Sequence, residues 1–252
     1  MPGARHWPVD LSSLIDAHPA ERRALAVPGL LVIAGAAWVA LLAVHATGIA
    51  GETPTTLSLW ALMVAAMMLP TAIPMVRAFA DVVAAGRGRI APSTTFAFVA
   101  GYVVAWLGFA LVAAIAQIAL AHSGLLTTSG RSTSLAFTAV LLLGAGAYQL
   151  TPAKAGCASR CRTPMAFLLS RWRDGHVGAL ALGTRHGVDC VGCCWALMTL
   201  GFVSGVMDPA WMTVAMTLMG VEKLPVIGKR VTLPLGGALV GAGLITAITA
   251  AL

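Results

Sequence analysis

The chain carries very little charge for its length. Only 10% of its 252 residues are Asp, Glu, Lys or Arg, and only nine of them are acidic, whereas a soluble globular domain has about 25% charged residues. With 59% hydrophobic residues and a mean hydropathy of +0.89, this composition excludes an ordinary soluble domain. It predicts an all-α, polytopic membrane protein. The formal net charge of +7 then reflects membrane topology and attraction to lipid headgroups, and does not indicate nucleic-acid binding.

Motifs of several common functional classes are also missing. The sequence has no phosphate-binding glycine loop, no Gly-x-Ser-x-Gly string, no His-Glu-x-x-His string and no paired intramembrane carboxylates of the di-iron kind. No convincing internal repeat is present, which disfavours an inverted-repeat transporter. These absences leave open whether the protein is an enzyme.

Apolar runs account for most of the chain. Six to seven of them are long enough to cross a bilayer, which takes about 20 residues each. We therefore expect a bundle of six to seven transmembrane helices forming one domain over residues 27–252, preceded by an arm over 1–26. The longest connection, 152–188, is expected to be a cysteine-bearing loop. The predicted spans are 27–47, 57–78, 94–121, 132–151, 189–207, 209–228 and 232–252.

The basic residues predict the orientation. If the N-terminus is cytoplasmic, all 16 Lys and Arg residues except Arg131 fall on the cytoplasmic side. Cytoplasmic loops of membrane proteins carry such an excess of basic residues. We therefore expect the N-terminal arm and the 152–188 loop to be cytoplasmic.

All five cysteines lie in one window. On the cytoplasmic side thiols stay reduced, which disfavours a disulfide framework, and thiolates at this density bind soft metal ions. A single cysteine in a membrane helix means little, but a Cys-x3-Cys pair and a Cys-x2-Cys-Cys cluster together are hard to attribute to packing. We predict a metal site, for copper or alternatively zinc. Its candidate sulfur ligands are Cys157, Cys161, Cys190, Cys193 and Cys194.

The spacing in the second half of the window fits one helix face. Cys190, Cys194 and Met198 are related as i, i+4 and i+8. Gly201 and Gly205 continue this face as a Gly-x-x-x-Gly motif, which lets helices approach closely. We therefore expect the thiol face to point into the bundle.

Two neighbouring residues extend the prediction. Cys193 lies about 100° around a helix from Cys194, so it is expected to reach the segment that carries Cys157 and Cys161. Asp189 directly precedes the cluster and is predicted to be a helix N-cap.

Ligands other than cysteine are also expected. His186 precedes Cys190 by four residues, so both would share a helix face, and His186 is the best nitrogen ligand candidate. Met67, Met68 and Met198 carry soft thioethers suited to copper(I). A methionine stripe is more often packing than coordination, so both interpretations of these methionines stay open.

Ionisable residues within the apolar runs are few. Glu222 and Lys223 close the predicted span 209–228. Such residues are costly in a membrane and are often functional. Near the end of a span, however, a lysine can also extend to the interface as an anchor.

The cysteine cluster carries a family resemblance. The string from His186 to Met198, with its Cys-x2-Cys-Cys-Trp motif, resembles the core of a bacterial family of uncharacterised integral membrane proteins that are described as metal-binding and copper-chaperone-like. The resemblance extends over roughly residues 25–230, and it implies metal binding by the five cysteines in a bacterial inner membrane. The other matching pieces are 66–70, 148–152, 205–207 and 211–212, together with Lys154, Cys157-x3-Cys161-Arg162 and Glu222-Lys223.

The leading functional hypothesis is therefore copper handling or delivery at a membrane. The expected partners are the lipid bilayer, the metal ion and a metal-donating or metal-accepting protein, and not a nucleic acid. A copper-dependent oxidase or monooxygenase is one alternative, although such sites usually need His ligands. A thiol–disulfide oxidoreductase that uses Cys193 and Cys194 with the loop pair is another.

Overall fold

The computed structural model describes residues 26–47, 53–87 and 92–252. Over these ranges the chain is helical with no β-strand, which confirms the all-α prediction. The expected N-terminal arm lies outside the described residues except for Ala26. The helices are α2 (Ala26–Thr47), α3 (Thr53–Arg87), α4 (Pro92–His122), α5 (Leu135–Gln149), α6 (Pro152–Arg162), α7 (Pro164–Arg171), α8 (Gly175–Thr199), α9 (Gly201–Ser204), α10 (Pro209–Glu222) and α11 (Ile227–Ala251).

Several helices are long and apolar enough to cross a membrane. In the described part of the chain there are five such segments, or six if the pair α5 and α6, bent by 62°, counts as one broken span. The sequence predicted six to seven. The predicted span at 209–228 is instead α10, whose 14 residues extend only about 21 Å, less than the roughly 30 Å hydrocarbon core of a bilayer. The five segments are Val27–Thr47, Thr55–Ala84, Ser93–His122, Gly175–Ser204 and Ile227–Ala251.

The segment 152–188 is helical, so the prediction of a loop there was wrong. It contains α6, α7 and the first half of α8. Helix α6 begins where the Thr151 side chain accepts a hydrogen bond from the Lys154 amide, with Pro152 in the first turn, a standard helix start. The polar composition suggested a loop, but Lys154 and Arg162 are buried. Their charges belong to the interior of the bundle.

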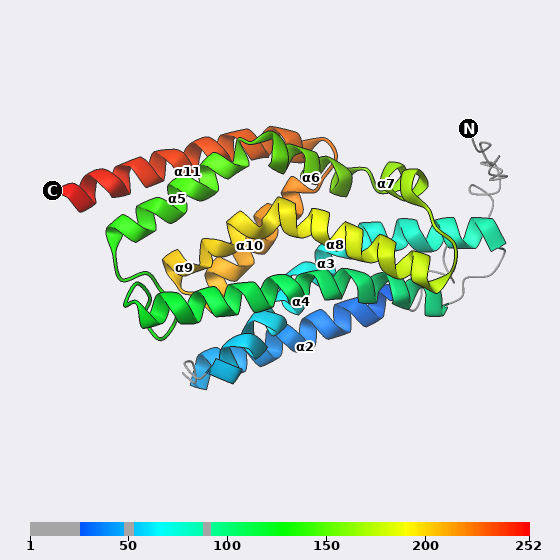
Figure 1. Ribbon diagram of the computed structural model, residues 1–252, viewed down its shortest axis with the longest axis horizontal. Coiled ribbons are helices and arrows are strands. Elements are labelled where there is room, and N and C mark those ends of the chain that lie inside the picture. The colour runs from blue at the N-terminus through cyan, green and yellow to red at the C-terminus, as the bar shows by residue number, and fades with distance from the viewer. Residues whose placement is uncertain (1–25, 48–52, 88–91) are drawn as a thin grey trace.

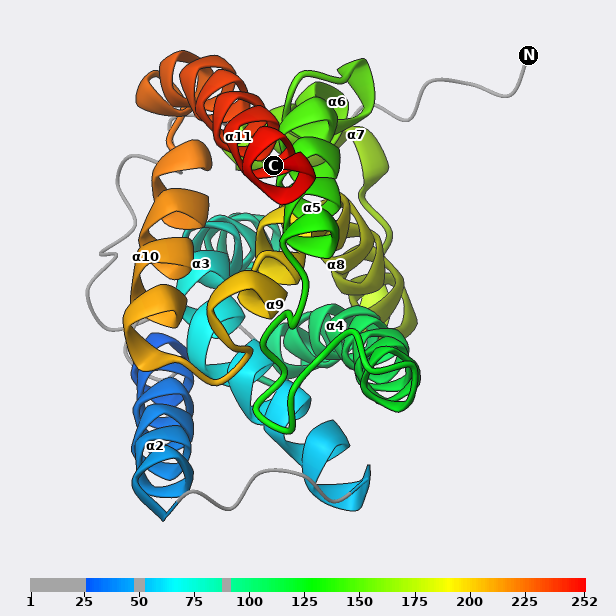
Figure 2. The ribbon, with the colours of Figure 1, turned by 90° about the vertical axis from the view of Figure 1, so that its left-hand side faces the viewer.

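The helices pack in pairs. Helices α5 and α11 lie side by side and antiparallel along one edge of the molecule, α4 and α8 run along each other through the middle, and α2 packs on α3 (Figure 1). Seen end-on, α10 lies beside α3 and below the start of α11 (Figure 2). Helix α8 therefore lies between the α5–α11 pair and α4 (Figure 1), and α6 packs on α8.

Glycines allow α4 and α8 to approach closely. A Cβ atom on Gly183 would lie 1.9 Å from the Phe98 carbonyl oxygen, and one on Gly187 would lie 2.6 Å from Ala105 Cβ and 2.9 Å from the Tyr102 carbonyl oxygen. No side chain fits at either position, so the two backbones are in direct contact. This contact brings Tyr102 of α4 against the cysteine-bearing half of α8.

Two local predictions about α8 were wrong. Asp189 is not an N-cap, because α8 begins after Asp174 and Asp189 lies well inside the helix. The predicted glycine stripe is also interrupted, since α8 ends at Thr199. Gly205 follows α9 with φ 112°, a backbone conformation that favours glycine.

Candidate metal centre

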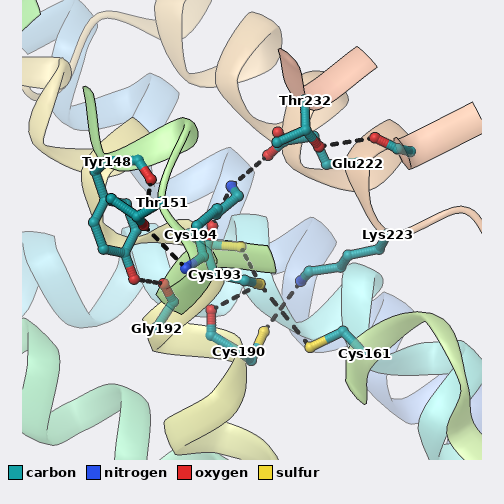
Figure 3. A network of polar contacts seen from close by, with 12 residues as sticks. Tyr148, Thr151, Cys161, Cys190, Gly192, Cys193, Cys194, Glu222, Lys223 and Thr232 are labelled. Atoms are coloured by element: carbon teal, nitrogen blue, oxygen red, sulfur yellow. Dashed lines mark hydrogen bonds and ion pairs between the residues drawn. The ribbon is translucent and has the colours of Figure 1, made fainter. Parts of the chain in front are cut away.

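Three cysteine thiols meet in the interior of the bundle. Cys161 comes from α6, and Cys190 and Cys193 come from α8. Their Sγ atoms all lie within 4.8 Å of one another, and the side chains converge in Figure 3. The Cys161 and Cys193 sulfurs are 3.9 Å apart, so Cys193 makes the contact with the α6 segment that its position on the helix predicted.

The spacing of these sulfurs suits one soft metal ion. A thiolate–zinc bond is about 2.3 Å long, so sulfurs that surround an ion at this distance are roughly 4 Å apart. Cys194 adds a fourth thiol, with its Sγ 3.3 Å from that of Cys193. All five cysteines are free, and Cys190, Cys193 and Cys194 are almost completely buried.

Cys157 lies apart from these three thiols. It is half-buried and precedes Cys161 by one helical turn. A Cβ atom on Gly192 would lie 2.8 Å from its Sγ, so Cys157 packs on the backbone of α8 rather than among the other sulfurs. Nearby, Arg160 pairs with the buried Asp189 across 2.7 Å, which fixes α6 on α8.

A lysine and a tyrosine contact the Cys190 sulfur. Lys223 donates from Nζ to Cys190 Sγ at 3.1 Å and to Thr71 Oγ1 at 2.6 Å. The Tyr102 hydroxyl lies 3.4 Å from the same sulfur and donates to the Met68 carbonyl oxygen at 3.0 Å. A cation beside a sulfur stabilises negative charge on it, so this arrangement favours a bound thiolate.

A buried ionic network holds the surrounding helices together. Lys154 Nζ lies 2.7 Å from Glu222 Oε2, with the two side chains 1% and 3% exposed, and it also donates to the Cys193 carbonyl oxygen at 2.5 Å. Arg162 donates to the Glu222 carbonyl oxygen and to Thr232 Oγ1. The network joins α6, α8, the end of α10 and α11 around the thiols.

The predicted nitrogen ligand, His186, lies one helical turn before Cys190. Its ring is 3% exposed and stacks on Tyr102 with centroids 5.4 Å apart and on Phe98 with centroids 6.2 Å apart. Its Nδ1 has no hydrogen-bond partner among the described residues. His186 lines a pocket that also reaches Cys161 and Lys223.

The predicted methionines are all buried. Met68 contacts both residues that surround Cys190 with polar groups, since its carbonyl oxygen accepts from Tyr102 and Thr71 and its Sδ lies 4.0 Å from Thr71 Oγ1. Met67 and Met198 lie in the same hydrophobic core. The structure therefore brings Met68 near the site and gives Met67 and Met198 packing contacts.

Sequence reasoning missed Tyr102, Thr71 and the inward direction of Lys154. One feature could have indicated the tyrosine. The chain has only two tyrosines, and both hydrogen-bond beside the cysteines: Tyr102 as described, and Tyr148 by donating to the Gly192 carbonyl oxygen. Thr71 had no comparable signal, and Lys154 was among the residues that carry the family resemblance, with nothing to indicate that its side chain points inward.

The donor set has a definite chemical preference. Thiolates are soft ligands that select copper(I), zinc and iron–sulfur clusters. Within the described residues, the one group of three or more His, Cys, Asp or Glu side chains placed to hold an ion consists of cysteines alone. The arrangement can therefore bind a soft ion but offers few of the His ligands that copper oxidases use.

Comparison with known proteins agrees with this chemistry. No curated protein and no solved structure matches the chain. A family model described as "PpoB2: Copper chaperone" matches residues 57–246, a range that contains every residue of the thiol cluster. This range is about three quarters of the 252 residues, and the chain therefore belongs to the PpoB2 copper chaperone family.

Proposed function

We propose that this protein is an integral membrane protein that binds copper(I) through Cys161, Cys190 and Cys193 and exchanges it with another protein. The observation that carries the proposal is the meeting of three buried thiols from two helices within 4.8 Å. The family description, copper chaperone, supports copper as the cargo. The Cys194 sulfur lies 3.3 Å from that of Cys193 but is not one of the three proposed ligands.

Copper(I) is favoured over zinc by the family description, copper chaperone, and by the all-sulfur donor set. Three thiolates leave a net charge of about −2 with a monovalent ion and about −1 with a divalent one, and the Lys223 ammonium beside Cys190 offsets one unit of this charge with either ion. Methionine sulfur, which Met68 brings near this lysine, is also a ligand type that suits copper(I). Zinc remains the alternative cargo, and metal analysis of the purified protein distinguishes it from copper.

The proposed location is a bacterial inner membrane, with residues 27–252 as one transmembrane domain and the N-terminus in the cytoplasm. The five apolar helical segments support insertion. The asymmetry of basic residues in the sequence supports the orientation, although Lys154 and Arg162 are buried and do not contribute to it.

Metal analysis tests the proposal. Protein purified in detergent under reducing conditions should contain about one copper per chain. The triple variant Cys161→Ser/Cys190→Ser/Cys193→Ser should contain none, and the matched variant Cys157→Ser should retain it. Equal copper in the wild type and the triple variant would contradict the proposal.

One contact favours a second function, a thiol–disulfide oxidoreductase. Cys161 Sγ and Cys193 Sγ are 3.9 Å apart on different helices, close enough to bridge with a small shift. The adjacent pair Cys193 and Cys194 is a poorer choice, because neighbouring Cα atoms are about 3.8 Å apart and disulfides usually need about 4.4–6.8 Å. Alkylation trapping in cells distinguishes the two functions, since an oxidoreductase would show a Cys161–Cys193 disulfide and a copper carrier would show reduced thiols.

A further inference from the structure

A pocket opens beside the thiol cluster. It has a volume of about 130 Å³ and lies where α3, the α6–α7 junction, α8 and the segment after α10 meet. A water molecule occupies about 30 Å³ in the liquid, so the pocket holds an ion with a few small ligands but no folded segment. Its walls include Thr71, Cys161, Pro164, His186, Lys223 and Leu224.

Cys161 is the thiol that connects this pocket with the cluster. It is the one cysteine among the residues that line the pocket, and its Sγ lies 3.9 Å from that of Cys193. Cys190, Cys193 and Cys194 lie behind it and are 1–3% exposed. An ion that enters by this pocket therefore meets Cys161 before the other thiols.

His186 offers a nitrogen ligand in the same pocket. Buried polar atoms are nearly always hydrogen-bonded, yet Nδ1 of this 3% exposed residue has no partner among the described residues. The ring is held in place by stacking on Tyr102 and Phe98 and by an edge contact with Phe167 at 5.7 Å. A fixed imidazole with a free nitrogen is a suitable copper ligand.

The charged side chains of the pocket favour an anionic copper(I) complex over a bare copper(I) ion. Lys223 and Arg162 both line it, so it disfavours a bare cation. Copper(I) held by two thiolates is an anion of charge −1, and the two cationic side chains attract such a complex. The pocket is large enough to accept the ion with one donor sulfur at a time.

We propose that this pocket is the port through which copper(I) reaches the cluster, and that His186 and Cys161 bind the ion there first. This inference rests on the proposed function. The transfer is a ligand exchange without a change of oxidation state. In the first exchange the copper–sulfur bonds to the donor break as bonds from copper to the Cys161 sulfur and the His186 nitrogen form, and the donor thiolates leave, one of them taking the proton of the Cys161 thiol. In the second exchange the copper–imidazole bond breaks, bonds from copper to the Cys190 and Cys193 sulfurs form, and the thiol protons displaced pass to solvent.

The rate of copper loading tests the port. Metal-free protein in detergent is mixed with the copper(I)–glutathione complex, and bound copper is followed with time. His186→Phe keeps the aromatic stacking but removes the nitrogen, so it should load at least about tenfold more slowly, while the final copper content stays at the wild-type value. The control His176→Phe alters an exposed histidine that bonds to Ser93 and should load at the wild-type rate.

A second variant blocks the port without touching a ligand. Leu224 is 44% exposed at the pocket, and Leu224→Trp should also slow loading at unchanged final copper content. Its control is Leu169→Trp, at a 53% exposed position of α7 that is not among the pocket-lining residues. If His186→Phe does not fold, Leu224→Trp alone decides the question.

The possible results distinguish a failure of the port proposal from a failure of the proposed copper-binding function. Wild-type loading rates in both His186→Phe and Leu224→Trp overturn the port, as does a loss of equilibrium copper in His186→Phe, which would make His186 a ligand of the final site. A wild-type protein that takes up no copper at all contradicts the proposed function instead.

Discussion

Lys223 Nζ lies 3.1 Å from Cys190 Sγ, although the two residues come from different helical regions and are 33 positions apart. The same ammonium also donates to Thr71 Oγ1, whose own proton goes to the Met68 carbonyl oxygen. The lysine is therefore oriented toward the sulfur by a fixed acceptor. Its neighbour Glu222 pairs with Lys154 instead, which leaves the Lys223 charge directed at the thiol.

Replacing Lys223 should weaken copper binding. A hydrogen bond to a charged group contributes about 1.5–3 kcal/mol, so Lys223→Met should reduce copper(I) affinity about 10- to 100-fold. Lys223→Arg keeps the positive charge and should therefore reduce copper(I) affinity less than Lys223→Met does. Competition with a coloured copper(I) chelator measures both, and equal affinities for Lys223→Met and the wild type would show that the charge plays no part in binding.

Removing one partner of the buried Lys154–Glu222 pair should strongly lower the stability of the protein. Glu222→Gln leaves the buried Lys154 charge without its carboxylate, which should lower the free energy of unfolding by about 3–5 kcal/mol. The double variant Lys154→Met/Glu222→Met removes both charges and should be nearly as stable as the wild type. Denaturant unfolding in detergent compares them. Full stability of Glu222→Gln would mean that the carboxylate is not needed to compensate the lysine.

Much of this network was hidden from the sequence. The apolar runs predicted the positions of the long helices α2, α3, α4 and α11, because crossing a bilayer demands about 20 apolar residues in a row, but they gave α10 the length of a full span. Lys154 and Arg162 looked like loop residues because hydropathy cannot show that their partners lie 60–70 positions further along the chain. For the same reason the 152–188 segment appeared to be a loop although it is helical.

The contact between α4 and α8 can be tested with a matched pair of glycines. Gly183→Ala would place a methyl group 1.9 Å from the Phe98 carbonyl oxygen, so the helices must separate and stability should fall by more than about 2 kcal/mol. The control Gly35→Ala, with nothing within 4 Å of the added carbon, should be neutral or stabilising by up to about 1 kcal/mol. Thermal unfolding in detergent measures both changes. A Gly183→Ala protein as stable as Gly35→Ala would contradict the packing described for these helices.

The two cysteines of α6 should differ in their effect on copper. Cys161→Ser removes one of the three meeting sulfurs, and a two-thiol site should bind copper(I) at least about tenfold more weakly. Cys157→Ser should bind like the wild type, because Cys157 packs against Gly192 and lies outside the cluster. Chelator competition on the two single variants provides the comparison, and the reverse ranking would place the ligand at Cys157.

The site itself was only partly visible in the sequence. Helical spacing placed Cys190 and Cys194 on an inward face, and the position of Cys193 predicted its contact with the Cys161 segment, which the 3.9 Å separation bears out. Helical spacing did not distinguish Cys161 from Cys157, since both lie on the same face of a short helix. Only the packing of α6 on α8 determines which of them meets the other thiols. Tyr102 and Lys223 join Cys190 from α4 and from the end of α10, and such contacts depend on the tertiary structure.

X-ray absorption at the copper edge, on wild-type protein loaded with one equivalent of copper(I), tests the central claim most directly. The account predicts three sulfur neighbours at about 2.3 Å and a monovalent ion, with one sulfur fewer in Cys161→Ser. A first shell dominated by nitrogen or oxygen, or a spectrum unchanged in Cys161→Ser, would contradict it.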